Sequence, residues 1–529
     1  MTATLYRNGV VAAVDAPRAE ALLVADSAIV WLGTDEEAST LIDQAQEVVD
    51  LDGALVTAGF VDAHVHVLET GFALTGLDLS GVPTLEAALD ALAKAAAGSE
   101  LVLAHGWDET RWPEGRGPTR AELDRASAGG QVYAARADLH SAVISTSLAE
   151  RAGCKGARGW REDGLVTAEA HHRARLAARD VAPGRRESLY RSALESMAAR
   201  GVVSVHEQSA PYVDTRGGLA ALLALTADPA SGLPGVVGYR AEPCETVNDA
   251  RALQSEIPGL TGVGGDLNVD GSIGSRTAAL REPYSDGPGR GALQLTAEQI
   301  ANHVTATTSA GVQAAFHAIG DAAIDELILG FQTACEVEGM AAVRAAGHRL
   351  EHGEMLDAHA TACILLFGIT VSAQPAFDAT WGGPGGMYSQ RLGWSRAALL
   401  NPLADLLGLG VPVAFGSDSP VTPVDPWASV RAAVVHHEPS QRIPVAAALR
   451  AHTRGGWQAA GLGQDGAGEI RVGAPASIAL WQVPSFAPDA GAAGQEPVTP
   501  PLPDLHDAAA SPRCLRTLRD GVVIHDAIG

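Results

Sequence analysis

Short apolar runs alternate with Ala- and Leu-rich segments of helical period between about residues 58 and 465. Apolar runs of this length, each followed by a helical segment, are typical of βα units around a parallel sheet. Ten runs are candidate buried strands: AGFVDAHVHV, LVLAHGWD, QVYAARAD, GVVSVHEQ, GVVGYRAE, GGDLNVDG, VQAAFHAIG, HRLEHGE, ITVSAQP and VPVAFGSDS. A closed barrel requires eight strands, so some of these runs must lie in insertions.

Both ends of the chain follow another pattern. Residues 1–57 contain short strand-like runs with Gly or Asp-Gly breaks, which predict antiparallel hairpins. Residues 466–529 contain two similar runs, GEIRVGAPASIALWQV and CLRTLRDGVVIHDA. A stretch rich in Pro, Ala, Gly and Asp separates them, from about Ser485 to Pro512, and predicts an exposed loop. The chain is thus divided into residues 1–57, 58–465 and 466–529.

Polar side chains stand at the C-terminal ends of several candidate strands. In parallel barrels these ends carry the reactive groups, because the loops that follow them open at one face. The residues concerned are His64, His66, Glu207, Asp270, His317, His352 and Asp418. Taken singly, a histidine in such a place is explained at least as well by packing or capping.

Five of these residues predict a metal site. His64 and His66 are two positions apart on one strand, so their imidazoles point to the same face. Alone, this pair fits a metal clamp and two exposed histidines about equally well. Together with His317, His352 and Asp418, the pair is spread over at least four strands, and packing does not readily explain all five.

Four imidazoles and one carboxylate suit Zn²⁺ or another divalent metal of borderline softness, whereas Ca²⁺ or Mg²⁺ would require oxygen ligands. We expect one such ion, with a second site left open. A catalytic metal lowers the pKa of water towards about 7, which permits hydrolysis at neutral pH. Asp418 is placed to accept the water proton and to return it to a leaving group, as general base and acid.

The charge balance limits the partners. Acidic residues outnumber basic ones by 62 to 37, and the formal net charge is −25. A nucleic acid or an anionic membrane needs a positive surface, so we expect a small-molecule substrate instead, with homo-oligomerisation left open. Five widely spaced cysteines make neither a disulfide framework nor a thiolate zinc site. The N-terminus is unlike a signal peptide, and a cytoplasmic protein is expected.

An ordered series of segments resembles the amidohydrolase superfamily, and within it the YtcJ-like branch (amidohydrolase family 3), which includes N-substituted formamide deformylases. The segments are TAGFVDAHVHV, GWDETRWPEGRGPTRAELD, RADLHSAVIS, DGSIGSRTAAL, FHAIGD, HRLEHGE, SAQPAF, FGSDSPV and GEIRVGAPASIAL. The resemblance implies an α/β fold, a (β/α)8 TIM barrel with a small β-sandwich built from both termini. It also implies hydrolysis of a non-peptide carbon–nitrogen bond, in an amide or an N-formyl or N-acyl amine.

The resemblance assigns the metal ligands, and one position departs from the family pattern. By motif, the first strand supplies His64 and His66, the fifth and sixth supply His317 and His352, and the eighth supplies Asp418. Many binuclear relatives carry a carboxylated lysine on the fourth strand, where this chain has Asp266. The only lysines of the chain, Lys94 and Lys155, lie far from these motifs, so no carbamate bridge is expected.

Asp266 is several bonds shorter than a carboxylated lysine, and we expect that it does not span the gap between two metals. Either the site holds one metal, or another carboxylate bridges two. Glu207 in SVHEQ is the candidate bridge, although a salt bridge or a buried hydrogen bond explains it equally well. We therefore favour one tightly held metal.

Candidate substrate-binding residues flank these motifs. The segment GWDETRWPEGRGPTRAELD predicts a long ordered loop, and by resemblance it covers the mouth of the active site. Trp107 in this segment is a candidate apolar wall, although a tryptophan beside prolines is more often packed. Asp270 is a candidate for substrate contact. His140 and Arg276 are candidates for substrate contact or oxyanion stabilisation, with a structural role equally open.

Two alternatives to amide hydrolysis are weighed. A mononuclear site without the lysine permits hydrolytic deamination of a heterocycle, but such deaminases usually place a glutamate a few residues after the fifth-strand histidine. Here Asp321 follows His317 by four residues. A non-catalytic barrel scaffold is less favoured, because loss of catalysis usually removes ligands. The fold and the metal site do not specify the substrate.

Overall fold

The computed structural model describes residues 3–487, 500–506 and 511–528. Its centre is an eight-stranded parallel sheet in which the strands are neighbours in chain order. They are β7 (Phe60–Val65), β13 (Val202–Ser209), β14 (Gly235–Arg240), β15 (Leu260–Val263), β16 (Gln313–Ala318), β17 (Arg349–His352), β18 (Thr370–Ala373) and β19 (Val413–Phe415). An isolated parallel bridge between Val65 and Ser419 links the end of β7 to the segment after β19, so the sheet is nearly closed.

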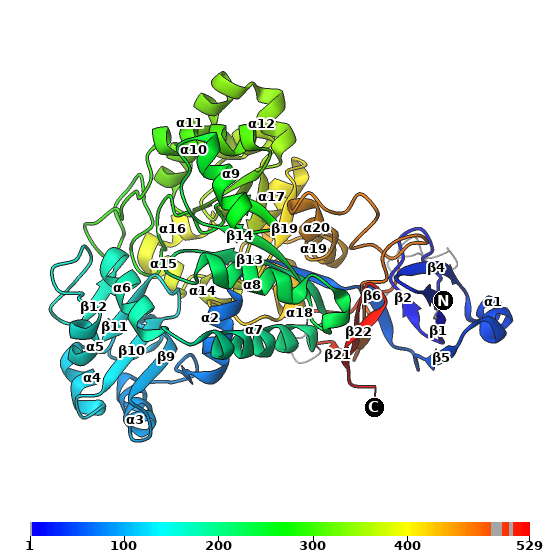
Figure 1. The fold of residues 1–529 in the computed structure, drawn as a ribbon, viewed down its shortest axis with the longest axis horizontal. Coiled ribbons are helices and arrows are strands. Elements are labelled where there is room, and N and C mark those ends of the chain that lie inside the picture. The colour runs from blue at the N-terminus through cyan, green and yellow to red at the C-terminus, as the bar shows by residue number, and fades with distance from the viewer. Residues whose placement is uncertain (1–2, 488–499, 507–510, 529) are drawn as a thin grey trace.

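Helices surround this barrel (Figure 1). They include α2 (Val67–Thr75), α7 (Pro183–Ala198), α8 (Arg216–Thr226), α9 (Val247–Glu256), α10 (Ala297–Ala310), α11 (Asp321–Glu338), α13 (Ala358–Phe367) and α18 (Pro426–Val434). In β16, Phe316 packs against Phe331 of α11, with ring centroids 6.0 Å apart. Successive strand residues alternate in direction, so His317 points into the barrel. The predicted (β/α)8 TIM barrel is therefore confirmed.

Three of the ten candidate strands lie outside the barrel. LVLAHGWD and QVYAARAD form β9 (Leu101–Trp107) and β10 (Gln131–Arg136) of a separate sheet. GGDLNVDG is a loop after β15, and only Asn268 of this loop forms a bridge, to His317. The barrel strand at this place is β15 itself, whose short run LTGV lacks a strong strand pattern.

Two glycines explain why the chain leaves the barrel after β15. Gly264 and Gly265 have φ values of 124° and 80°, a region that favours glycine. A Cβ atom on Gly264 would lie 1.8 Å from the carbonyl oxygen of Ala315, and one on Gly265 would lie 1.9 Å from Oε1 of Gln208. These glycines permit a turn, and the turn places the next residue, Asp266, at the open end of the barrel.

A five-stranded sheet is inserted between α2 and α7, in the order β12-β11-β10-β9-β8. Its other strands are β8 (Leu77–Asp78), β11 (Ser141–Ile144) and β12 (Leu165–Thr167), and α3 (Leu85–Ala96), α4 (Arg120–Ala126) and α6 (Ala168–Ala178) accompany it. Figure 1 shows this unit, in light blue and cyan, beside the barrel and away from the chain termini. The predicted loop GWDETRWPEGRGPTRAELD belongs to this unit, where it connects β9 to α4.

Trp107 is packed within the inserted unit. Its side chain is buried, its ring stacks on Trp112 with centroids 6.2 Å apart, and its Nε1 donates to the carbonyl oxygen of Ala134. The structure thus shows the packed arrangement that tryptophans beside prolines usually adopt, rather than an apolar wall at the active site.

Both chain ends contribute to two further sheets. One has the order β4-β3-β1-β5, from β1 (Ala3–Arg7), β3 (Ala21–Ala25), β4 (Ala28–Gly33) and β5 (Glu47–Asp50). The other has the order β2-β6-β20-β21-β22, from β2 (Val10–Val11), β6 (Leu55–Ala58), β20 (Ile478–Gln482), β21 (Arg513–Arg519) and β22 (Val522–Asp526). A shared apolar core joins the two sheets.

The sheet that contains β20 is anchored to the barrel by aromatic contacts. Trp481 of β20 lies 5.5 Å, between ring centroids, from both Phe60 of β7 and Trp427 of α18. Of the predicted loop from about 485 to 512, residues 488–499 and 507–510 lie outside the described residues. Among the helices that the structure describes, none has the length and apolar character needed to cross a membrane.

Candidate metal centre

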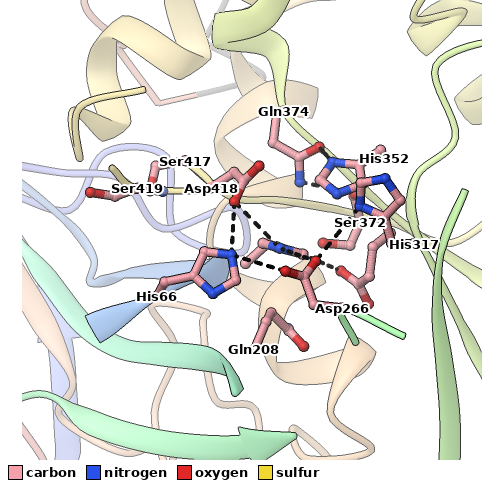
Figure 2. Close-up of polar contacts among 12 residues, drawn as sticks. His66, Gln208, Asp266, His317, His352, Ser372, Gln374, Ser417, Asp418 and Ser419 are labelled. Atoms are coloured by element: carbon pink, nitrogen blue, oxygen red, sulfur yellow. Dashed lines mark hydrogen bonds and ion pairs between the residues drawn. The ribbon is translucent and has the colours of Figure 1, made fainter. Parts of the chain in front are cut away.

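The predicted ligands come together at the open, C-terminal end of the barrel. They are His64 in β7 and His66 directly after it, His317 in β16, His352 at the end of β17, and Asp418 after β19. Figure 2 shows His66 with dashed lines to both Asp418 and Asp266, and His317 and His352 near Asp266. The structure therefore brings all five residues together and adds Asp266 to them.

His64, His66 and Asp418 form a compact group whose ligand atoms all lie within 4.8 Å of one another. Oδ1 of Asp418 is 3.2 Å from Nε2 of His66 and 3.5 Å from Nε2 of His64. Nε2 of His64 and Oδ1 of Asp418 are buried and have no hydrogen-bond partner. Buried polar atoms without partners are costly, so this donor set fits a divalent metal.

Asp266 contacts both halves of the ligand cluster. Its Oδ2 is 3.4 Å from Nε2 of His66, and its Oδ1 is 3.7 Å from Nε2 of His64 and 3.6 Å from Nδ1 of His317. A second group of possible ligands consists of His64, Asp266 and His352. Asp266 therefore stands between the histidines, where the Gly264–Gly265 turn places its backbone. The expectation that its side chain does not span the gap between two metals stays a prediction.

Glu207, the candidate bridge, has a different place. Its Oε2 accepts a hydrogen bond of 2.6 Å from the backbone N–H of Val67, at the start of α2. Burial raises the pKa of this carboxyl group to about 7. Glu207 thus supports the helix that follows His66, and Asp266 occupies the central position that was expected for Glu207.

A layer of hydrogen bonds orients the imidazoles. Nδ1 of His64 is 2.9 Å from Oε2 of Glu351, which pairs in turn with Arg349 at 2.8 Å. Nδ1 of His352 is 2.7 Å from Oε1 of Gln374. Such partners fix which ring nitrogen carries the proton, so that the other nitrogen is free to bind a metal.

Sequence reasoning missed these supporting residues. Arg349 and Glu351 are two charged residues at i and i+2 in a fully buried strand, and this unusual pattern could have revealed them. For Gln374, which directly follows β18, the chain offers no comparable pattern.

The carboxylates control the charge of two imidazoles. Burial alone would lower the pKa of His66, but Asp266 and Asp418 outweigh it and raise that pKa to about 9. Asp266 has the same effect on His317, whose pKa also rises to about 9 against the effect of burial. The same histidines hold the pKa of Asp266 well below its usual range despite its burial. A cation is thus strongly favoured between these groups, and a divalent metal can replace the protons.

Backbone strain accompanies two of the ligands. His352 and Asp418 have φ values of 71° and 54°, in the left-handed region that residues other than glycine rarely adopt. Such conformations cost about 1–3 kcal/mol each and cluster at functional sites. Their presence at two candidate ligands is consistent with a functional centre.

A cavity opens above the ligand cluster. His66, Asp266, His317 and Asp418 line it on the barrel side, and α6 with the preceding segment lines it on the side of the inserted unit. A second, more apolar cavity lies on the other side of His140 and is lined by Ile273, Ile319, Phe377, Trp381, Met387 and Tyr388, among others. His140, a predicted substrate contact, faces both cavities, and its ring centroid is 5.1 Å from that of His317.

The remaining candidates, Asp270 and Arg276, lie apart from the cavities. Asp270 is fully buried and accepts hydrogen bonds from the backbone N–H groups of Ala279, Ile319 and Gly320. Arg276 forms a two-pronged pair with Asp286, at 3.1 and 2.8 Å. Both residues hold loops in place, which is the structural role left open for Arg276.

Comparisons with known proteins agree with this arrangement. The model of the amidohydrolase family matches residues 47–525. The YtcJ amidohydrolase of Bacillus subtilis (strain 168) is 25% identical over 83% of this chain and 86% of its own length. The N-substituted formamide deformylase of Arthrobacter pascens is 23% identical over 97% of this chain and 96% of its own.

A solved structure extends the similarity to three dimensions. An uncharacterized metal-dependent hydrolase from Pyrococcus furiosus is 26% identical, with a TM-score of 0.69, over 90% of this chain and 98% of its own. The family match covers nearly the whole chain, and the ligand cluster is present at the barrel mouth. The chain therefore belongs to the amidohydrolase family, and it is a hydrolase whose donor set suits a divalent metal.

Proposed function

We propose that this hydrolase cleaves the carbon–nitrogen bond of a non-peptide amide, either an N-formyl or another N-acyl amine. One observation supports the proposal above all. His64 and Asp418 have buried ligand atoms without hydrogen-bond partners that lie 3.5 Å apart, and Asp418 lines the cavity. A relative aligned over 97% of this chain is named as an N-substituted formamide deformylase, which acts on this class of bond.

Asp418 is the general base and acid of the proposed reaction. It lines the cavity, and its position beside His64 and His66 lets it receive a proton from water at the ligand cluster. His64, His66 and Asp418 would hold a divalent metal, for which Zn²⁺ suits this imidazole-rich set best, and such an ion would supply polarisation of the amide carbonyl and a lower pKa for water. Asp418 then delivers the proton to the departing amine nitrogen, so that the amine leaves neutral.

His140 is the proposed donor to the carbonyl oxygen. Burial, with a smaller effect from His317, lowers the pKa of His140 to about 4. The ring is therefore neutral near pH 7 and carries one N–H group. Because His140 faces the cavity beside His317, this N–H can stabilise the oxygen as it gains negative charge during attack.

The position of Asp266 favours two metals rather than one. Its Oδ2 faces His66, its Oδ1 faces both His64 and His317, and the ring centroids of His317 and His352 lie 4.4 Å apart. By resemblance Asp266 matches the carboxylated lysine of binuclear relatives, and in this proposal it would be the residue that holds both ions. We expect two divalent ions per chain, and one in an Asp266→Asn variant.

The deaminase alternative has little support from Asp321. This carboxylate accepts hydrogen bonds from the backbone N–H groups of Arg281 and Ala322, at the start of α11. The carboxylate is thereby engaged by backbone groups at the start of the helix and in the loop that contains Arg281. A proton donor for a heterocycle would have to face the cavity instead.

The test is a panel of N-formyl, N-acyl and cyclic amides assayed for amine release with Zn²⁺-, Mn²⁺- and Fe²⁺-loaded protein. We expect release from at least one class, and a loss of about 100-fold or more in kcat in Asp418→Asn with little change in unfolding. Asp90→Asn on the exposed face of α3 is the matched control and keeps full activity. Near-full turnover by Asp418→Asn, or ammonia release from aminotriazines without amine release, would overturn the proposal.

A further inference from the structure

One wall of the cavity is positively charged, although the protein as a whole is strongly acidic. The wall comes from the inserted unit, where α6 contributes His171, His172 and Arg175, and Arg158 lies at the exposed rim. Ala168, the first residue of α6, also lines the cavity, so the positive end of the helix dipole is near it. A net charge of −25 repels anions in general, so a local cationic wall is needed to hold one.

Arg175 has no acidic partner in the part of the chain that the structure describes. Its side chain is buried, with only 6 % of the residue exposed, and its Nη2 donates 2.8 Å to the carbonyl oxygen of Leu139. Its Nε is buried without a hydrogen-bond partner. Among the residues that the structure describes, no carboxylate lies within ion-pair distance of this guanidinium group. A buried charge in this state is costly unless a ligand supplies the counter-charge.

The carboxylates that line the cavity already interact with other residues. Glu69 pairs with Arg179, and Asp138 pairs with Arg136 at 3.1 Å. Asp266 and Asp418 belong to the ligand cluster. None of these four groups is therefore available to neutralise Arg175.

The two histidines beside Arg175 carry no charge that could bind an anion. Burial, reinforced by Arg175, lowers the pKa of His171 well below its usual range and that of His172 to about 4. Both rings are neutral near pH 7. The fixed positive charge of this buried wall is therefore that of Arg175.

Tyr212 connects Arg175 to the ligand cluster. The guanidinium carbon of Arg175 lies 5.8 Å from the centroid of the Tyr212 ring, and His172 stacks on that ring at 3.9 Å. The Tyr212 hydroxyl donates to the carbonyl oxygen of Asp266 at 3.3 Å. Arg175 is thus separated from the loop that carries Asp266 by the side chain of Tyr212 alone.

We propose that the substrate carries a carboxylate, which binds Arg175 while the amide lies over the ligand cluster. The substrate class is then a carboxylate-bearing amide, such as an N-acyl amino acid, rather than a neutral amide. This inference rests on the proposed amide hydrolysis at the same site. A guanidinium group binds a carboxylate through charge-assisted hydrogen bonds, which gives it both affinity and a fixed direction.

The test measures binding apart from turnover. N-Acetyl amino acids and their N-methyl amides are titrated calorimetrically into Zn²⁺-loaded Asp418→Asn protein. We expect the free acids to bind about 10- to 100-fold more tightly than the amides, because charge-assisted hydrogen bonds contribute this much. Adding Arg175→Gln should abolish that preference, and Arg175→Lys should retain part of it. Arg173→Gln, on the exposed face of the same helix, is the matched control and keeps the preference.

Each result separates this inference from the function on which it rests. If wild-type protein hydrolyses neutral and acidic amides equally, and Arg175→Gln leaves both unchanged, the inference fails while amide hydrolysis stands. If the acids bind through Arg175 but no amide is hydrolysed, the anion site stands and the proposed reaction fails. Thermal unfolding of Arg175→Gln and Arg175→Lys shows whether either variant is misfolded. If Arg175→Gln is misfolded, the preference for acids is measured in Arg175→Lys instead.

Discussion

At the scale of single residues, groups that do not bind the metal decide how the ligands are presented. Glu351 holds His64 through Nδ1, and Gln374 holds His352 in the same way. In both rings the other nitrogen is then left for the ligand cluster. The orientation of the cluster is therefore encoded in β17 and in the residue after β18 as much as in the ligands themselves.

The variant Gln374→Met tests how much the orientation of the His352 ring contributes to metal binding, while His352 itself is kept. The variant removes the acceptor of the His352 Nδ1–H bond and keeps a side chain of similar length. We expect metal affinity to fall by about 10-fold, as is typical when a supporting partner is lost, with little change in unfolding. The measurement is competition with a chromophoric chelator, with Gln390→Met, exposed on α15 (Met387–Leu392), as the control. Unchanged affinity would mean that the stacking of Phe377 on His352, at 6.0 Å, is sufficient to orient the ring.

At the scale of elements, the sequence predicted the ligands that stand on strong strands. His64, His66, His317 and His352 follow apolar runs, so their place at the barrel mouth could be inferred. Asp266 could not be placed in this way, because it follows a turn rather than a strand. Its position depends on close contacts between Gly264–Gly265 and the neighbouring barrel residues, which are set by tertiary packing.

The same limit applied to the choice of barrel strands. The run LVLAHGWD has a better strand pattern than LTGV, but it forms β9 in the inserted unit, whereas LTGV forms β15 in the barrel. A local pattern measures the tendency to form a strand, and it does not say which sheet the strand will join. The pairing partners decide that, and they are distant in the chain.

Gly264→Ala tests the turn that places Asp266. The new Cβ atom would meet the backbone of Ala315 at φ = 124°, so the loop must shift. We expect fewer bound metal ions per chain and a loss of about 1–3 kcal/mol in unfolding free energy. Metal analysis and urea unfolding measure the two effects. Gly289→Ala, whose Cβ atom would meet open space, is the control. An unaltered metal content in Gly264→Ala would contradict the role given to this turn.

At the scale of the whole molecule, the cavity is shared between two units of the chain. The barrel supplies the ligand cluster, and the inserted unit supplies the opposite wall with Arg175. The sheets formed by the two termini lie on the other side of the barrel, where Trp481 packs on Phe60 (Figure 1). Under the two proposals above, reaction chemistry and substrate choice are encoded in different segments, and the inserted unit would set specificity without changing the ligands.

Removing the metal should make the stability of the whole molecule depend on pH in a defined direction. Asp266 and Asp418, outweighing burial, raise the pKa of His66 from 6.5 to about 9, and Asp266 does the same for His317. A raised pKa in the folded state stabilises the fold fully below about pH 6.5, and this contribution is lost as the pH rises through 9. We expect the Tm of chelator-treated protein to fall between these pH values. Zn²⁺-loaded protein should lack this fall, because the metal replaces the protons. Chelator-treated Asp266→Asn should show a smaller fall, and an equal fall would exclude Asp266 as its cause.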